Sequence, residues 1–505
     1  MMGQRTLTLM AAALLACALP AKATVMPPAL DPSTLPATGT VHPRFQSYNI
    51  EMVEVTGGRF WKPYRLGPPA SPEDRYAYRP PLDLANPRLV RLAAALGPAI
   101  VRVSGTWANR TWFQAQPGTT RPPGFDQTLT MAQLAGLARF LRATDGELLL
   151  SFAGVPRLPD GRWDPAQMQA LVAASRRAGI RLIAGHYLNE PNLVHLTGTP
   201  KGYSANEFAR DSDLFATAFR RAAPGALVLA PDAVGQGPAI EALARAANQP
   251  VLGVEAMMAP MRVTVDAVAY HHYGGVSERC ATSGPLALTA ASAFDPAFLA
   301  RTDATAAYYA ALRDRFAPGA PLWLTEVAQA ACGGSRWAAT FADTPRYIDQ
   351  MGRLARAGVQ VILHNTLAAS DYALLDERDF APRPNYWAAL LWARLMDRRV
   401  LTTDHPSPTL RLYAHCLKGR RGGVALVAVN LEAEPRTIAL AQRAEIYALA
   451  DADTGRAVTL NGTRLALGPR DALPALNAVG ADALTVAPRG VSFAVVPDAG
   501  NRACR

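Results

Sequence analysis

Hydrophobic and polar positions form two alternating kinds of segment from about residue 45 to residue 396. Short, nearly continuous apolar runs are separated by longer runs in which apolar residues recur every three or four positions. The apolar runs predict eight strands, at Phe45–Val53, Ala99–Ser104, Glu147–Ala153, Arg181–Leu188, Leu227–Ala230, Ala267–His272, Pro321–Thr325 and Val359–Asn365. The runs between them predict helices, such as Met131–Thr144, Pro165–Ala178, Ala205–Ala222, Thr305–Phe316 and Pro345–Ala357. Near-continuous apolar strands separated by helices indicate a parallel sheet covered on both faces.

Eight such units predict a (β/α)8 TIM barrel over residues 45–396. An open, doubly wound sheet is the alternative, but it predicts a glycine-rich phosphate loop after the first strand, which the sequence lacks. After about Val400 the chain changes to short β-type runs joined by turns. This pattern is typical of an antiparallel β-sandwich, predicted here over residues 397–505. Part of the Pro-rich segment 24–44 is a candidate further strand of that sandwich. The predicted fold class is α/β with a C-terminal β-sandwich.

The N-terminus has the pattern of an export signal. Residues 1–23 contain Arg5, an apolar run from Leu7 to Leu19 and the small-residue site Ala21-Lys22-Ala23. The mature protein is therefore expected to be secreted or periplasmic. Leu14-Leu15-Ala16-Cys17 resembles a lipoprotein box, so anchoring through Cys17 is an alternative. Later apolar runs are far shorter than the about 20 residues of a membrane span, so none is expected.

Export leaves four cysteines, Cys280, Cys332, Cys416 and Cys504. An even number in an oxidising compartment suggests two disulfides. Of the three possible pairings we favour 280–332 and 416–504, because each lies within one predicted domain. Free buried thiols are the alternative. No cysteine pair has the spacing of a zinc site, and we expect no metal and no cofactor.

The chain carries a net charge of +11, which favours an anionic partner through long-range attraction. Its basic residues are scattered along the sequence and form no nucleic-acid-binding motif, so nucleic acid is not expected. We expect a monomer that acts on an anionic partner.

Two carboxylates stand at predicted strand ends, where barrels of this kind carry their chemistry. Glu190 follows the fourth strand within Asn189-Glu190-Pro191-Asn192, and Glu326 follows the seventh. A carboxylate at the end of an apolar strand is costly if buried without a partner. Two opposed carboxylates are the apparatus of glycoside hydrolysis. The alternative is that each one is a salt-bridged residue on the barrel rim.

Several further motifs occur in a fixed order with these two carboxylates. They are Asn189-Glu190-Pro191-Asn192, His271-His272-Tyr273, Trp323-Leu324-Thr325-Glu326, Gly333-Gly334, Asp371-Tyr372, Pro384-Asn385-Tyr386-Trp387 and Leu412-Tyr413-Ala414-His415-Cys416. With this set the chain resembles the heparanase family, glycoside hydrolase family 79, whose members are retaining barrel enzymes that cleave β-glucuronides. The resemblance implies that Glu190 is the acid/base and Glu326 the nucleophile.

The resemblance also suggests how a substrate is held. Asn189 would bind the sugar 2-hydroxyl, and Tyr273 would orient the nucleophile. The amides of Gly333 and Gly334 and the hydroxyl of Tyr372 would bind the glucuronate carboxylate. Further candidate substrate-binding residues are Glu51, Thr106, Gln236 and His272. Neighbouring residues on a strand face opposite sides, so His271 and His272 are not expected to share a metal ion.

The expected function is that of an endo-β-glucuronidase acting on glycosaminoglycans such as heparan sulfate. An exo-acting β-glucuronidase and a non-catalytic polysaccharide-binding protein are the alternatives. Animal heparanases carry a basic cluster after the position of Gln236, which this chain lacks. The departure leaves open how sulfated heparan is held and whether basic residues such as Arg279 or Arg336 compensate. The family resemblance also implies the Cys416–Cys504 bond and an active single chain, because the linker that animal enzymes excise is short here.

Overall fold

A computed structural model describes residues 28–235 and 251–505. The predicted signal of residues 1–23, Cys17 and Gln236 lie outside the described residues. Eight parallel strands form a closed barrel in sequence order, which confirms the predicted barrel and excludes the open sheet. The strands are β2 (Gln46–Glu51), β5 (Ile100–Ser104), β8 (Glu147–Ser151), β9 (Leu182–His186), β10 (Leu227–Val234), β11 (Ala267–His272), β12 (Leu322–Val327) and β13 (Val361–His364).

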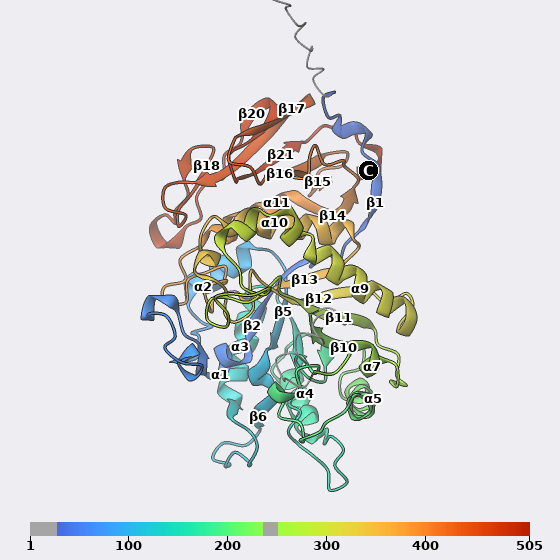
Figure 1. Cartoon of the computed structure of the whole chain (residues 1–505). Helices are drawn as coiled ribbons and strands as arrows, with labels where there is room; N and C mark the ends of the chain where they lie inside the picture. The colour runs from blue at the N-terminus through green and yellow to red at the C-terminus, as the bar shows by residue number, and fades with distance from the viewer. Residues whose placement is uncertain (1–27, 236–250) are drawn as a thin grey trace, which may run out of the picture.

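Helices surround the barrel (Figure 1). They include α1 (Met52–Thr56), α2 (Pro87–Ala95), α3 (Met131–Ala143), α4 (Ala166–Arg177), α5 (Ala205–Ala222), α7 (Val254–Met258), α8 (Pro296–Leu299), α9 (Arg301–Phe316), α10 (Asp343–Arg356) and α11 (Pro384–Leu395). Capping boxes formed by Thr130 with Gln133 and by Ser204 with Glu207 begin α3 and α5. Within the described part of the chain, no helix has both the length and the apolar character needed to cross a membrane.

Side chains of the barrel strands alternate between two cores. In β11, Ala267 and Ala269 belong to the core inside the barrel, whereas Val268 and Tyr270 pack outward against the helices. The same alternation puts His271 inside and His272 outside, because successive residues of a strand face opposite sides.

The C-terminal strands form an antiparallel sheet that also includes one strand from the N-terminal segment. Its members are β1 (Ala37–Thr40), β14 (Met396–Leu401), β15 (Leu410–Leu417), β16 (Val424–Asn430), β17 (Arg436–Asp451), β18 (Val458–Leu460), β19 (Thr463–Arg464), β20 (Val479–Val486) and β21 (Val491–Val496). Two of the short β-type runs after Val400 belong to the single long strand β17, whose register shifts between Ala439 and Ala444. Residues on both sides of the shift pair with β20, and residues 445–449 also pair with β21.

Both faces of this sheet are covered, which confirms the sandwich. In β16, Val424, Leu426 and Ala428 face the core shared with β20, while alternate residues face the barrel core. Helices α10 and α11 lie between the barrel and the sheet (Figure 1). The Cys416–Cys504 disulfide joins β15 to the C-terminus, and a second disulfide joins Cys280 to Cys332. These are the two pairs favoured from the sequence.

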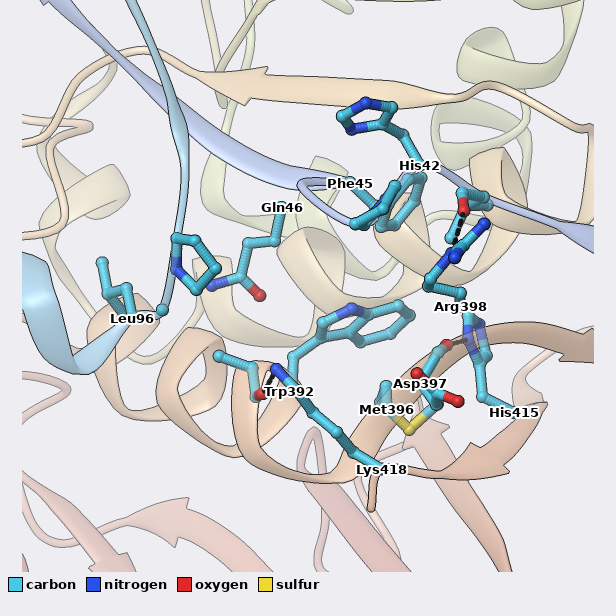
Figure 2. Close-up of a pocket in the computed structure, with 15 residues that line it drawn as sticks. His42, Phe45, Gln46, Leu96, Trp392, Met396, Asp397, Arg398, His415 and Lys418 are labelled. Carbon is cyan, nitrogen blue, oxygen red and sulfur yellow. Dashed lines mark hydrogen bonds between the residues drawn. The ribbon is translucent and has the colours of Figure 1, made fainter. Parts of the chain in front are cut away.

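A hollow of about 60 Å³ marks the junction of barrel and sheet (Figure 2). It lies at the start of β2, next to Phe45 and Trp392, and the Lys418 ammonium donates to the Ala393 carbonyl at 2.8 Å. The starts of the strands are the end of the barrel opposite to Glu190 and Glu326, so this hollow serves the junction rather than the candidate site.

Gly352 tests the tight contact between α10 and the sheet. A Cβ atom at this glycine would overlap the ring of Tyr413, whose hydroxyl donates to Asp349 at 2.5 Å. We expect Gly352→Ala to lower the free energy of unfolding by about 1–3 kcal/mol, measured by urea denaturation. The matched control is Gly136→Ala in α3, where the nearest other atom is 3.9 Å away. This control should raise the free energy of unfolding by up to about 1 kcal/mol, because alanine has a higher helix propensity than glycine. Equal effects of both changes would contradict the close packing.

Candidate active site

Glu190 and Glu326 meet at the C-terminal mouth of the barrel. Glu190 lies in the loop after β9, and Glu326 belongs to β12. One carboxylate oxygen of each lies within 4.8 Å of the other. Their side chains are 12% and 7% exposed, so the pair is almost removed from water. Glu190 has a left-handed backbone (φ 49°), a strained conformation for this residue that concentrates at functional sites.

Two β-bulges turn acidic residues into the barrel. The register between β11 and β12 shifts after Tyr270, so β12 contains one extra residue at Thr325-Glu326. Strand β10 likewise contains one extra residue, Asp232, relative to β11. A bulge redirects the side chains that follow it. Without it, Glu326 would follow the outward direction of Leu324, because the two residues are two apart.

A buried guanidinium connects the two bulged strands. Arg102 of β5 donates to Glu326 Oε2 at 2.9 Å, to Asp232 Oδ2 at 2.8 Å and to the Asn189 side-chain oxygen at 2.7 Å. His271 extends the network, with Nε2 at 3.1 Å from Asp232 and Nδ1 at 3.0 Å from Glu190 Oε1. Thr325 donates to the other Asp232 oxygen at 2.6 Å. Each acid thus faces a positive charge or a hydrogen-bond donor.

The surroundings shift the pKa values of these groups in different directions. Burial, reinforced by the charge of Glu326, raises the pKa of Glu190, although the hydrogen bond from His271 opposes this. Burial disfavours charge on His271, but Asp232 and Glu326 outweigh it and raise the His271 pKa to about 10. Burial also disfavours charge on Asp232, yet Arg102 and the histidines hold the pKa of Asp232 well below its usual range. His271 is therefore a cation near neutral pH, and Glu190 keeps its proton to a higher pH than an ordinary glutamate.

Tyr273 and Asn365 complete the opposite wall. The Tyr273 hydroxyl donates to Glu326 Oε1 at 2.5 Å. The Asn365 amide donates to Tyr273 at 3.1 Å, to Tyr372 at 3.0 Å and to Glu51 Oε1 at 3.2 Å. Burial and the charge of Glu326 raise the pKa of Glu51 well above its usual range. Tyr273, Tyr372 and Glu51 thus share one hydrogen-bonded group with Glu326.

Asn189 and Thr106 lie on the side of β5 and β9. Asn189 is fixed by Asn109, which accepts from its amide and donates to its carbonyl, both at 2.9 Å. Thr106 begins a short 3-10 helix (η4, Thr106–Arg110) directly after Gly105. A Cβ atom at Gly105 would overlap the carboxyl group of Glu51, so this turn packs against the site.

Gly333 and Gly334 form a turn beside Tyr372. Both have left-handed backbone (φ 75° and 79°), and a Cβ at Gly333 would lie 2.7 Å from Trp61. Within residues 28–235 and 251–505, neither glycine amide donates a hydrogen bond. The Cys280–Cys332 disulfide holds the start of this turn.

Arg279 lies behind the diglycine turn rather than in the open mouth. It is 3% exposed, and it donates to the carbonyls of Cys332 at 3.1 Å and Gly334 at 2.6 Å and pairs with Asp371. Arg279 is therefore not available to replace the missing basic cluster, because its donors are used within the protein. In a trans peptide, the Gly333 N–H points away from the Cys332 carbonyl, and so away from Arg279.

His272 is not part of the site. Its Nδ1 lies 2.9 Å from the Thr305 hydroxyl of α9, outside the barrel, and burial lowers its pKa to about 3. Sequence reasoning missed Arg102, Asp232 and Asn365, and treated His271 only as part of a motif. Of these residues, Arg102 could have been found from the sequence, because it is the one charged residue of a predicted strand that is otherwise apolar. Asp232 was missed because the predicted strand stopped at Ala230.

Glu190, His271 and Glu326 are also the group that could hold a metal ion among the described residues. Their contacts fit a metal-free site better. Both nitrogens of His271 face carboxylates, and Arg102 already provides a second cation beside Glu326. A further cation would face two positive charges at close range.

Asp232→Asn tests the charge balance of the network. With the carboxylate removed, burial dominates at His271, and we expect its pKa to fall from about 10 to near or below the ordinary value of about 6.5. An NMR titration of the imidazole signals, assigned with a His271→Asn variant, measures this. His272, on the other side of the strand, is the internal control and should not shift. A His271 that stays protonated to pH 10 in the variant would contradict the role of Asp232.

No protein-family model matches the chain. It is 38% identical to heparanase-like protein 1 of Arabidopsis thaliana over 170 residues, which cover 33% of this chain and 30% of that protein. It is 33% identical to baicalin-β-D-glucuronidase of Scutellaria baicalensis over 171 residues, or 31% and 32% of the two chains. It is 25% identical to heparanase of Bos taurus over 378 residues, or 70% of this chain and 63% of that protein. The chain thus aligns with less than two thirds of the length of each relative.

Among solved structures, a 4-O-α-L-rhamnosyl-β-D-glucuronidase of Fusarium oxysporum 12S is similar over 93% of this chain and 99% of its own. The TM-score is 0.63 at 13% sequence identity, so this likeness concerns the fold. The chain is thus similar in sequence to proteins named heparanase and glucuronidase, and similar in fold to a glycosidase barrel with an antiparallel sheet.

Proposed function

We propose that this protein is a retaining glycoside hydrolase that cleaves glucuronic acid linkages inside glycosaminoglycans such as heparan sulfate. The observation that carries the proposal is the separation of Glu190 and Glu326, whose carboxylate oxygens approach within 4.8 Å. Retaining glycosidases hold their carboxyl groups about 5–5.5 Å apart, whereas inverting enzymes need about 6.5–9.5 Å for a water molecule.

The surroundings of the two acids support different roles. Arg102 and Tyr273 donate to the two Glu326 oxygens, which orients this carboxylate for attack on the anomeric carbon. Glu190 has a raised pKa and donates its proton to the leaving oxygen. Once Glu326 is bonded to the sugar, its charge no longer raises the pKa of Glu190. The hydrogen bond from His271 then favours the Glu190 carboxylate, which takes a proton from the attacking water.

The diglycine turn supports specificity for a sugar carboxylate. The unused amides of Gly333 and Gly334 lie beside Tyr372, and donors of this kind bind anions. Hydrogen bonds from the Arg279 cation to the carbonyls of this turn polarise its peptide groups. The names of the relatives, heparanase and baicalin-β-D-glucuronidase, support a glucuronide substrate.

Two other functions are alternatives to an endo-acting glucuronidase. An exo-acting β-glucuronidase would use the same two acids and the same turn. A non-catalytic polysaccharide-binding protein would not require both Glu190 and Glu326 within one buried network, which favours an enzyme. Export is part of the proposal, supported by two disulfides of the kind that persist in oxidising compartments.

Glu326→Gln tests the proposed reaction. We expect turnover of an aryl β-glucuronide to fall at least about 1,000-fold, because the nucleophile is lost while the shape of the site is kept. Glu255→Gln, a change in an exposed residue of α7, is the matched control and should retain activity. No β-glucuronide turnover by the unmodified protein, or full turnover by Glu326→Gln, would refute the proposal. Sizing the products from heparan sulfate separates the endo mode, which releases internal fragments, from the exo mode, which shortens chains one sugar at a time.

Glu190→Ala tests the acid/base role. Aryl glucuronides with good leaving groups should lose much less activity than natural chains, because protonation matters least where departure is easy. In the unmodified enzyme, kcat/KM should fall as the pH rises through the raised pKa of Glu190, since the protonated form is the donor. The variant should lose this alkaline decline. Equal losses on both substrates, with the alkaline decline retained, would assign the proton transfer to another group.

A further inference from the structure

A groove on the outer wall of the barrel gathers positive charge from separate parts of the sequence. It has a volume of about 810 Å³ and lies between α4, α5 and the residues that precede β11. Four arginines line it, against one acid, Asp213. The arginines are Arg162, Arg210, Arg221 and Arg262. Figure 1 shows α4 and α5 on the side of the barrel away from the antiparallel sheet.

One face of α5 forms a wall of this groove. Its lining residues are Asn206, Ala209, Arg210, Asp213, Leu214, Thr217, Ala218 and Arg221. They follow the spacing of a single helix face, and 11 residues of helix between Arg210 and Arg221 correspond to about 16 Å. Arginines therefore stand at both ends of a wall whose middle contains Leu214 and Ala218, which suit the carbon–hydrogen faces of sugar rings.

The single acid does not cancel this charge. The Asp213 carboxylate accepts from the amides of Arg262 at 3.0 Å and Val263 at 3.1 Å, and so fixes the far side of the groove. Arg162 forms an ion pair with Asp160, and Arg210 forms one with Asp211. Among the described residues, neither the Arg221 nor the Arg262 guanidinium has an ion-pair or hydrogen-bond partner. Two cations are thus available to an anion.

The groove runs along the barrel wall, from the end that carries Glu190 and Glu326 toward the opposite end. Arg162 lies in the loop after β8, on the face where the strands end, whereas Arg221 and Arg262 lie near the starts of β10 and β11. We propose that this groove is a second, non-catalytic binding site for a linear anionic polysaccharide, bound through its carboxylate or sulfate groups. One guanidinium group can donate two parallel hydrogen bonds to two oxygens of such a group. The choice of polysaccharide over other polyanions rests on the proposed function.

A second site would keep the other segments of a bound long chain within reach of the catalytic mouth. Binding at one place raises the effective concentration of the same chain at the other. The groove therefore predicts tighter binding of long chains than of fragments that span only one site.

The test measures binding of heparan sulfate to the Glu326→Gln protein, so that it needs no turnover. In this background, Arg221→Gln with Arg262→Gln should weaken binding of long chains about tenfold. It should also lower the slope of log Kd against log salt concentration by up to about 2, because a protein with fewer arginines in contact with the polysaccharide releases fewer counterions on binding. The matched control is Arg443→Gln with Arg464→Gln, which removes the same charge from side chains of the sheet that are 70% and 65% exposed.

The control pair should change the affinity less than twofold. Equal weakening by both pairs would overturn the proposal, because net charge alone would then explain binding. Single-stranded DNA that binds more tightly than heparan sulfate and loses this affinity with the groove arginines would assign the site to nucleic acid instead. Groove-dependent binding in a protein that turns over no β-glucuronide would support the groove and refute only the proposed reaction.

Discussion

The buried guanidinium of Arg102 is the interaction on which the mouth of the barrel depends. Asp232, Glu326, Glu190 and Glu51 all lie there, and ionised carboxylates removed from water are costly without partners. Arg102 contacts two of the four directly and the Asn189 side chain as well. His271 adds a second cation between Asp232 and Glu190. These two positive charges let an acidic cluster persist inside a folded barrel.

Unequal surroundings then distinguish the two glutamates. Glu326 has donors at both oxygens, from Arg102 and Tyr273. Among the described residues, the Glu190 carboxylate has one hydrogen bond, with His271, and burial and the charge of Glu326 raise its pKa. The asymmetry follows from their positions, since Glu326 belongs to a strand and Glu190 to the loop after one. A pair with such different surroundings suits opposite proton-transfer roles.

Arginines have two separate uses in this protein. Arg102 and Arg279 are buried and hold acids or backbone carbonyls in place, so they are not available to a polymer. Arg221 and Arg262 are exposed on the outer wall, and neither forms an ion pair with any residue of 28–235 or 251–505. The positive net charge of the chain therefore says little by itself, because only the exposed arginines attract an anion from solution.

The sequence by itself determined the barrel, the sandwich and the approximate place of both glutamates. The local pattern of apolar residues indicates which segments are buried. Continuous apolar runs such as Ala267–His272 therefore identify strands, and a polar residue after such a run marks the strand end. Tertiary structure alone decided which side chains meet. The bulges at Asp232 and Glu326 depend on the register against β11, and the basic groove depends on the approach of residues 162, 210, 221 and 262. Pairing between distant segments sets these features, and no local pattern of hydrophobic and polar residues encodes it.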